Sequence, residues 1–222
     1  MQYNFDQVVD RRRTGSIKWK FYGDDVLPMW VADMDFPPPP PILAALHARV
    51  EVGDFGYELP SPALGERICE RLQRRCNWSV TPDQIVYIPS LVTGLNAVCR
   101  AIGEPGDGVL VQTPVYPPFL TAPTNQGRVT QMAELEAVPN GRTFGYRVDY
   151  DRMNATVTDR TRLFILCNPH NPTGEAYSRE ELLRMAEFCE RHDLIICSDE
   201  IHCDLLLGGT RHIPIATLAP DI

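Results

Sequence analysis

Residues 168–204 read NPHNPTGEAYSREELLRMAEFCERHDLIICSDEIHCD, and this stretch decides the fold. An apolar run at 162–167 precedes it, and a second apolar run lies within it at 194–197. Short continuous apolar runs are typical of buried parallel strands. Between the two runs, Ser178 and Glu181 form a capping-box pattern in front of an apolar stripe with helical spacing. The sequence therefore predicts one strand–helix–strand unit.

Two polar side chains, Asn171 and Asp199, follow the two predicted strands where each strand ends. They are separated by about the length of one helical crossover, so both are expected at the same edge of a parallel sheet. Open α/β sheets bind ligands at the carboxyl ends of their strands. The sequence therefore predicts that Asn171 and Asp199 face one small molecule.

Other parts of the chain repeat the alternation of strand and helix patterns. Strands are expected at 84–88, 108–112, 128–135 and 146–148, and helices at 42–50, 62–78 and 149–157. From about residue 46 onward the sequence thus predicts an α/β fold with a mostly parallel sheet. Residues 1–45 are expected to be an irregular arm outside that sheet. The five prolines at 37–41 predict an extended segment within the arm.

The composition is that of an ordinary globular protein, with 44% hydrophobic and 23% charged residues. A net charge of −8 argues against nucleic-acid binding, because no basic run is concentrated enough to offset it. The basic run from Arg11 to Arg13 is expected on a solvated or subunit-contacting face. No apolar run approaches the ~20 residues that a membrane span needs, so no membrane partner is expected.

The seven cysteines include no C-x-x-C pair, and most of them lie on apolar strand or helix patterns. This predicts reduced, buried thiols in a cytoplasmic protein. The N-terminus lacks the charged-then-apolar layout of a signal peptide, which agrees with a cytoplasmic location. No zinc site or other metal site is predicted.

The motifs at 168–174 and 198–202, at this spacing, resemble those of the pyridoxal 5'-phosphate (PLP) enzymes of the aminotransferase fold. The stretch PMWVADMDF at 28–36 resembles, more narrowly, their MalY/PatB-type branch of cystathionine β-lyases, which are C–S β-lyases. The resemblance implies a three-layer α/β/α large domain over residues 46–222, incomplete at its C-terminal end before the small domain. Residues 1–45 would form the N-terminal arm and part of the small domain.

The resemblance also implies roles for residues around the cofactor ring. Asp199 would keep the pyridine nitrogen protonated, because a buried carboxylate favours the charged ring. Asn171 and His202 would donate hydrogen bonds to the 3-oxygen of the ring, and Tyr116 would stack on its face. The residues alone leave open that Tyr116 is a packed loop aromatic and that His202 only fills space.

A second group of residues is implied around the cofactor phosphate. The stretch 90–94 joins a predicted strand to a helix N-terminus, whose free amides and dipole suit a phosphate. Such junctions are common in α/β proteins, but the resemblance assigns the phosphate contacts to Val92 and Thr93. It also implies a homodimer in which Tyr57 reaches the phosphate of the partner subunit. A tyrosine in such a turn is otherwise a surface or interface residue.

The amino-acid substrate would be lined by Trp30, Ala32 and Asp33 in the same family. PLP catalysis also needs a lysine that holds the cofactor as a Schiff base and moves the α-proton. The sequence contains two lysines, Lys18 and Lys20, both in the arm. The resemblance places the Schiff-base lysine one strand and loop after the aspartate, beyond residue 222, and the substrate-carboxylate arginine in the C-terminal domain.

The leading hypothesis is PLP-dependent β-elimination at the C–S bond of cystathionine or a similar cysteine conjugate, giving a thiol, pyruvate and ammonia in a longer parent protein. An aminotransferase is the nearest alternative, because only the stretch 30–36 and His202 favour the lyase. A hypothesis from another class is a non-catalytic regulatory or assembly module that keeps the fold. The missing lysine would favour such a module if 222 residues were the natural length.

Overall fold

The structure of the protein is a computed structural model that describes residues 3–218. The chain forms two compact units, Met1–Leu59 and Pro60–Ile222. The predicted division into family domains after residue 45 stays a prediction. Within residues 3–218, no helix is long and apolar enough to cross a membrane.

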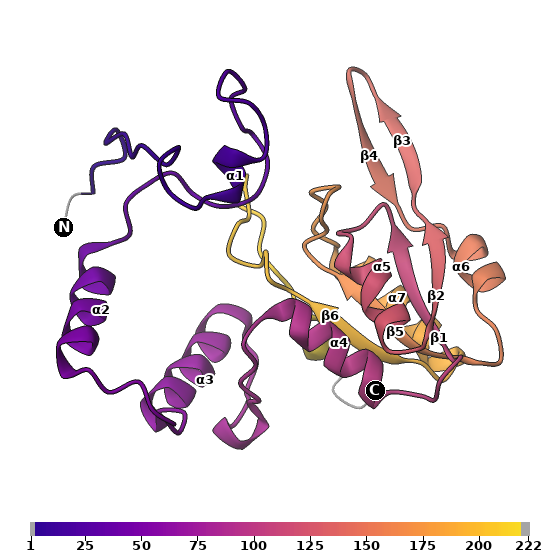
Figure 1. The fold of residues 1–222 in the computed structure, drawn as a ribbon. Helices are drawn as coiled ribbons and strands as arrows, with labels where there is room; N and C mark the ends of the chain where they lie inside the picture. Colours follow the sequence, from indigo (N-terminus) through magenta and orange to yellow (C-terminus); the bar gives the residue numbers. More distant parts are fainter. Residues whose placement is uncertain (1–2, 219–222) are drawn as a thin grey trace. The chain divides into compact units, whose positions relative to one another are not determined.

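Four parallel strands form the central sheet of the second unit (Figure 1). Their order across the sheet is β2-β1-β5-β6, with bounds Gly108–Thr113 for β1, Val129–Glu134 for β2, Thr161–Cys167 for β5 and Ile195–Asp199 for β6. In the β5–β6 pair, Leu163 lies opposite Ile195 and Cys167 opposite Asp199. The predicted strand–helix–strand unit and the mostly parallel sheet are therefore confirmed.

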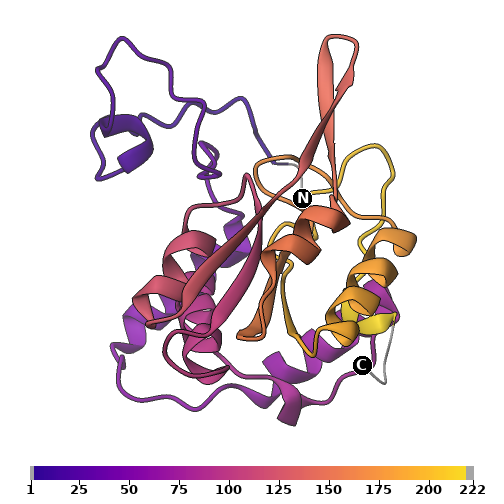
Figure 2. The same cartoon turned by 90° about the vertical axis from the view of Figure 1, so that its right-hand side faces the viewer.

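Helices cover both faces of the sheet, as Figure 2 shows. One face carries α4 (Leu91–Ala101) and α5 (Pro118–Asn125). The other face carries α6 (Tyr150–Thr156), α7 (Arg179–Arg191) and the short 3₁₀ helix η2 (Ile215–Thr217). The unit therefore has the three-layer α/β/α architecture that the resemblance implies.

The apolar runs of the central strands supply both cores. In β1, Val109 and Val111 pack with α4 and α5, whereas Leu110 packs with α6 and α7. In β5, Ile165 and Phe164 are divided between the same two cores. Successive side chains of a strand point to opposite faces, so a strand covered on both faces needs an unbroken apolar run.

The helix α7 begins and ends as its sequence predicts. The Ser178 hydroxyl accepts from the Glu181 amide at 3.2 Å, and a Glu181 carboxylate oxygen accepts from the Ser178 amide at 2.8 Å. This is the predicted capping box. The buried stripe of the helix consists of Leu182, Met185, Ala186, Phe188 and Cys189.

A two-stranded hairpin lies outside the main sheet. The strand expected at 146–148 is β4 (Thr143–Arg147), and it pairs antiparallel with β3 (Glu136–Asn140) rather than joining the parallel sheet. The hairpin projects beyond the sheet in Figure 1. Gly141 occupies the turn with φ +60°, a conformation that glycine adopts without a steric cost.

The strand expected at 84–88 is wrong. Pro82–Gln84 is a short 3₁₀ helix, η1, and no strand follows it before α4. Val86 is 82% exposed, and within residues 3–218 no segment forms a ladder with this stretch. An apolar run becomes a strand only when a neighbouring strand takes its hydrogen bonds. The other expected helix of the second unit, at 62–78, is α3 (Pro62–Cys76).

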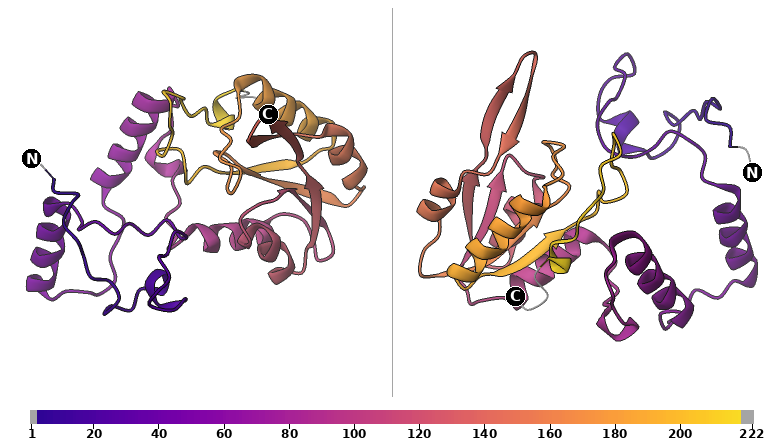
Figure 3. Two further views of the ribbon diagram at one scale, coloured as in Figure 1. Left: turned by 90° about the horizontal axis from the view of Figure 1, so that it is seen from above. Right: turned by 180° about the vertical axis from the view of Figure 1, so that it is seen from behind.

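The first unit consists of α1 (Ile17–Lys20), α2 (Pro40–Val52) and long irregular segments (Figure 3). The helix expected at 42–50 begins earlier, inside the proline run, because proline is well suited to the first position of a helix. The extended segment is therefore shorter than the expected 37–41. Gly53 ends α2 with φ +70°.

All seven cysteines are free thiols, in agreement with the prediction of reduced cysteines. The buried ones are Cys99, Cys167 and Cys189, and the other four are half-buried rather than buried. The part of the chain that the structure describes contains no cluster of three His, Cys, Asp or Glu placed to hold a metal ion.

Candidate functional site

Strands β1 and β5 are the neighbours at which the chain changes direction across the sheet. After β1 the chain passes to β2 on one side, and it returns to β5 on the other. Tyr116 follows β1, Asn171 follows β5, and the Tyr116 amide donates to the Asn171 carbonyl at 3.1 Å. Open α/β sheets bind ligands at such a switch point. The structure thus brings two predicted site residues together there.

The turn after β5 is tied to the end of β6. The Asn168 amide donates to the Asp199 carbonyl at 2.9 Å, and the Asn168 carboxamide oxygen accepts from the Tyr177 amide at 3.2 Å. The Asn171 carboxamide takes no part in this network: among residues 3–218, only the Asn171 backbone forms hydrogen bonds. Its donor and acceptor are therefore available to a ligand.

Asp199 ends β6 and is only 5% exposed. Its Oδ1 accepts from the Ile201 amide at 3.1 Å. Burial raises the pKa of the Asp199 carboxyl, while the Ile201 amide and the nearby His202 ring act against that rise. A cationic group bound beside such a carboxylate would favour its charged form. The end of β6 is therefore suited to a ligand that carries a positive charge.

The N-terminus of α4 offers donors to an anion. Ser90 is the N-cap, and its hydroxyl accepts from the Thr93 amide at 3.2 Å and contacts the Thr93 hydroxyl at 2.9 Å. The amides of Leu91 and Val92 donate to no group within residues 3–218. Free amides at the positive end of the helix dipole suit a phosphate. Thr93 offers its hydroxyl there rather than its amide.

The sequence pattern described as aminotransferase class I and II matches residues 29–222. The chain belongs to the class I and II aminotransferase family. This family is PLP-dependent, and PLP-bound proteins are among the solved structures that resemble the chain.

Three known proteins are similar to the chain over nearly all of its length. Cystathionine beta-lyase PatB of Bacillus subtilis (strain 168) is 42% identical, over 98% of this chain and 57% of its own length. The crystal structure of OvoB has a TM-score of 0.91 at 44% identity, over 99% of this chain and 57% of that chain. The PLP-bound C–S lyase from Staphylococcus hominis has a TM-score of 0.89 at 32% identity, over 100% and 57%. The chain spans a little over half the length of these relatives.

The residues at the sheet edge fit the family's cofactor. PLP carries a pyridine nitrogen that gains a positive charge on protonation, a ring oxygen that accepts hydrogen bonds, and a phosphate. The buried Asp199 carboxyl, with its raised pKa, matches the ring nitrogen. The unused Asn171 carboxamide matches the ring oxygen, and the start of α4 matches the phosphate. The site thus offers chemistry for each part of the cofactor.

Four other predicted site residues belong to the first compact unit, whereas the sheet belongs to the second. They are Trp30, Ala32, Asp33 and Tyr57. Their roles stay predictions. Tyr57 is fully exposed, whereas Trp30 is half-buried. The Trp30 indole stacks at a tilt on Phe21 and donates from Nε1 to the Lys18 carbonyl at 3.3 Å.

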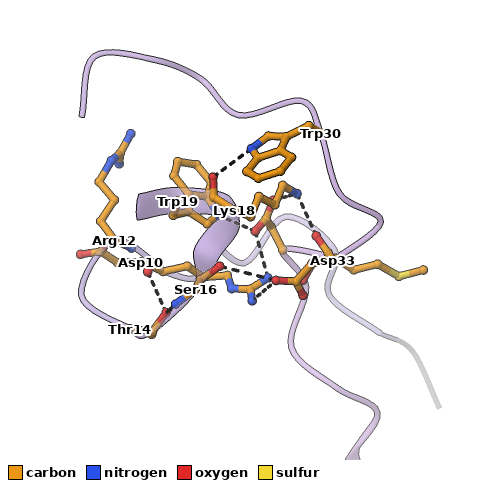
Figure 4. Close-up of polar contacts among 11 residues, drawn as sticks. Asp10, Arg12, Thr14, Ser16, Lys18, Trp19, Trp30 and Asp33 are labelled. Atoms are coloured by element: carbon orange, nitrogen blue, oxygen red, sulfur yellow. Dashed lines mark hydrogen bonds and ion pairs between the residues drawn. The ribbon is translucent and has the colours of Figure 1, made fainter. Parts of the chain in front are cut away.

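A polar cluster holds the segment that contains Asp33 (Figure 4). A guanidinium nitrogen of Arg11 lies 2.5 Å from a carboxylate oxygen of Asp33 and another 3.2 Å from Asp35. Trp19 Nε1 donates to Asp35 at 2.7 Å. The run from Arg11 to Arg13 was expected on a solvated or subunit-contacting face: Arg12 and Arg13 are exposed, whereas the Arg11 guanidinium is paired with the two aspartates.

Both lysines lie in the first unit, and one of them is fixed there. Lys18 Nζ donates to the Asp33 carbonyl at 2.8 Å and to Asp35 Oδ2 at 2.7 Å, whereas Lys20 is exposed. The structure therefore gives Lys18 a structural contact.

Two acidic residues after Asp199, Glu200 and Asp204, are bonded to other side chains. Asp204 forms ion pairs with Arg71 and Arg75, and a carboxylate oxygen of Glu200 lies within hydrogen-bond distance of His212 Nε2. The partners themselves were not predicted, because Arg71 and Arg75 are far away in the sequence and no pattern connects them to Asp204.

Two other residues at the edge were missed by sequence reasoning. Asn168 connects the two strand ends, and its place directly after an apolar run was the signal that could have found it. His212 lies in an irregular segment and carries no such signal.

Proposed function

We propose that this chain supplies the cofactor-binding part of a PLP-dependent C–S β-lyase. The substrate would be cystathionine or a similar cysteine conjugate, and the products a thiol, pyruvate and ammonia. The observation that carries the proposal is the buried Asp199 carboxyl at the end of β6, next to the switch point with Tyr116 and Asn171. The similarity of the chain to PatB and to the structure of a C–S lyase supports the lyase branch.

The residues of the edge would divide the cofactor between them. Asp199 would hold a proton on the pyridine nitrogen, because the charged ring is the form that its carboxylate stabilises. Asn171 and His202 would donate to the ring 3-oxygen, and Tyr116 would stack on the ring. The amide of Val92 and the hydroxyl of Thr93 would bind the phosphate. When bound, PLP supplies an electron sink for the electrons released at the substrate α-carbon.

The first unit would complete the substrate end. Trp30, Ala32 and Asp33 would line the amino-acid substrate, and the contacts of Asp33 with Arg11 would keep that carboxylate in a defined orientation. Tyr57 would reach the phosphate in the partner subunit of a homodimer, in keeping with its exposed side chain. We place the protein in the cytoplasm, in keeping with its free cysteines.

An aminotransferase is the second candidate function, because the family includes this activity and shares most of the site residues. Only the stretch 30–36 and His202 favour the lyase. A non-catalytic module that retains the fold is the third. It requires that the complete polypeptide lack a lysine that can hold PLP, and the length that relatives have beyond this chain favours the enzyme.

Pyruvate release separates these candidates. The complete polypeptide that carries this sequence is incubated with PLP and cystathionine, and pyruvate and ammonia are measured. Release of both products in equal amounts without an added keto acid is expected. Amino-group transfer to an added keto acid, without pyruvate from cystathionine, would favour the aminotransferase. The absence of both reactions would favour the non-catalytic module.

The role of Asp199 is tested in the same assay. Asp199→Asn is expected to keep the fold and to lose at least about 100-fold in rate, because an amide cannot stabilise the pyridinium charge. Asp159→Asn is the matched control, since Asp159 is exposed and its carboxylate forms no ion pair within residues 3–218. A rate for Asp199→Asn close to that of the control would contradict the assignment.

A further inference from the structure

Glu200, the neighbour of Asp199, is bonded on both of its oxygens. Its Oε1 accepts from the Ser198 hydroxyl at 2.9 Å, and its Oε2 lies 2.7 Å from His212 Nε2. The side chains of His212 and Glu200 are only 6% and 20% exposed. A charge-assisted hydrogen bond that is largely shielded from water is stronger than an exposed one. The Glu200–His212 hydrogen bond is therefore a strong contact at the residue that follows Asp199 in the chain.

The segment that carries His212 is itself anchored to the fold. The next residue, Ile213, packs against the core under α7, and its carbonyl accepts from the Asn168 carboxamide at 3.4 Å. Ile215 is buried in the same core. This return segment thus contacts the end of β5 through Asn168 and the end of β6 through Glu200.

A loop, residues 200–211, lies between the two members of the pair. It carries His202, and local turn bonds connect Glu200 to Cys203, His202 to Leu205 and Leu207 to Thr210. Beyond these bonds its tip is exposed and contains Gly208 and Gly209, both at positive φ. Among residues 3–218, the ion pairs of Asp204 connect the loop to α3, and the Glu200–His212 pair connects its two ends.

We propose that His212, acting through Glu200, is a positioning residue that closes the base of loop 200–211 and thereby fixes Asp199 and His202 for the cofactor. This inference rests on the proposed PLP site. In this role His212 contacts neither cofactor nor substrate. Its Nε2 atom is hydrogen-bonded to Glu200, and it acts through that residue. Burial is the main cause that raises the pKa of Asp199, and the charge of Glu200 adds to that rise.

Two variants of His212 separate positioning from simple packing. His212→Leu keeps a side chain of similar volume but removes the donor to Glu200. His212→Gln keeps a side-chain N–H at nearly the position of Nε2 and is expected to restore most of the effect. His192→Leu is the matched control, because it removes an imidazole hydrogen bond to Asn154 at the far end of α7. Circular dichroism and urea unfolding confirm that each variant is folded.

The first measurement is hydrogen–deuterium exchange without cofactor. In His212→Leu, amides at 200–206 are expected to exchange about tenfold faster, since a lost charge-assisted hydrogen bond is worth roughly that factor. Peptides of α7 should keep the protection of the unmodified protein. Unchanged exchange at 200–206, or the same change in His192→Leu, would overturn the proposal whatever the cofactor result.

The second measurement is the dissociation constant for pyridoxamine phosphate, followed by its fluorescence. This compound forms no covalent bond with a lysine, so it reports on the pocket residues alone. His212→Leu should weaken binding about tenfold, His212→Gln by much less, and His192→Leu not at all. Faster exchange at 200–206 with unchanged affinity would overturn the positioning role.

Failure of the proposed function gives a different result. If Asp199→Asn binds pyridoxamine phosphate as tightly as the unmodified protein, the PLP site is wrongly placed. The exchange data then still decide whether His212 closes the loop. If Asp199→Asn weakens binding and the His212 variants do not, the PLP site stands and the inference about His212 falls.

Discussion

Asp199 ends β6 with its carboxyl group almost entirely removed from solvent, and this has a consequence for stability. Burial raises its pKa, so the folded protein binds this proton more tightly than the unfolded chain does. The stability that this tighter proton binding by Asp199 contributes is therefore fully present below the ordinary pKa of aspartate. It is lost as the pH rises through the raised pKa of the folded protein. A residue kept for a ligand at the expense of stability is typical of functional sites.

Asp199→Asn should accordingly stabilise the protein in the absence of cofactor at pH 7, by on the order of 1 kcal/mol, because it removes a buried charge. The gain should shrink as the pH is lowered to 4, because the raised pKa lets the buried carboxyl take up a proton more readily than an ordinary aspartate. Urea unfolding at both pH values measures it, with Asp159→Asn as the exposed control. A variant less stable than the unmodified protein at pH 7 would show that the carboxylate is well solvated or paired.

His170 is the second residue whose burial predicts a pH effect. It is 2% exposed, no group among residues 3–218 hydrogen-bonds to its ring nitrogens, and burial lowers its pKa to about 4. In the unfolded chain the His170 imidazole therefore takes up a proton near pH 6.5, whereas in the folded protein it does so only near pH 4. The contribution of neutral His170 to the free energy of unfolding should be fully present above pH 6.5 and should be lost as the pH falls toward 4.

His170→Leu should remove this pH dependence. The unmodified protein is expected to lose up to about 3 kcal/mol of unfolding free energy between pH 7 and pH 4 through His170. The Leu variant should lose correspondingly less over the same range, measured by urea unfolding. His47→Leu, at an exposed histidine, is the control. Identical pH slopes for the Leu variant and the unmodified protein would mean that the His170 ring is hydrated.

At the scale of elements, α7 depends on its N-terminal cap. Ser178 and Glu181 each satisfy an amide of the other, which completes the first turn of the helix that covers one face of the sheet. Ser178→Ala should lower the unfolding free energy by about 1 kcal/mol, the usual value for a lost cap. Ser79→Ala, outside any helix, is a control. Denaturant unfolding with no difference between the two variants would count against the cap.

Arg128, which lies outside α4 in the sequence, caps the C-terminal end of that helix with its side chain. It is buried, and its guanidinium donates to the carbonyls of Arg100, Ile102 and Gly103 at the end of that helix. Arg128→Met should cost roughly 2–4 kcal/mol of unfolding free energy, because partly buried carbonyls lose their donor. The exposed Arg142→Met serves as the comparison. A cost below that of the comparison variant would mean that water replaces the guanidinium.

At the scale of the whole molecule, β6 is an edge strand of the described sheet, and Ile195 on it is exposed. Exposed strand edges favour aggregation. The 222-residue chain by itself is therefore expected to be poorly soluble and to bind PLP weakly through the sheet edge. Its two lysines lie in the first unit, where Lys18 is held by Asp35.

Borohydride reduction tests this expectation. The chain is mixed with PLP, reduced and mapped by mass spectrometry of its peptides. No pyridoxyl adduct is expected at any strand-end residue, and no pyruvate should form from cystathionine. An adduct on Lys18 or Lys20 together with pyruvate release would show that the chain carries its own catalytic lysine. Reduction of the complete polypeptide is the positive control.

The sequence by itself determined the elements whose signals are local. The apolar runs at 162–167 and 194–197, the capping box at Ser178 and the two polar motifs predicted one strand–helix–strand unit, with Asn171 and Asp199 following its strands. These predictions succeeded because burial on both faces and helix capping act over a few residues.

Only the tertiary structure decided which distant segments meet. The order β2-β1-β5-β6 makes β1 and β5 neighbours and so brings Tyr116 to Asn171. The return segment brings His212 to Glu200, whereas the apolar run at 84–88 finds no partner strand within the described residues and forms none. The physical reason is that strand pairing and ion pairs depend on what the rest of the chain places nearby, and short sequence patterns carry no record of those neighbours.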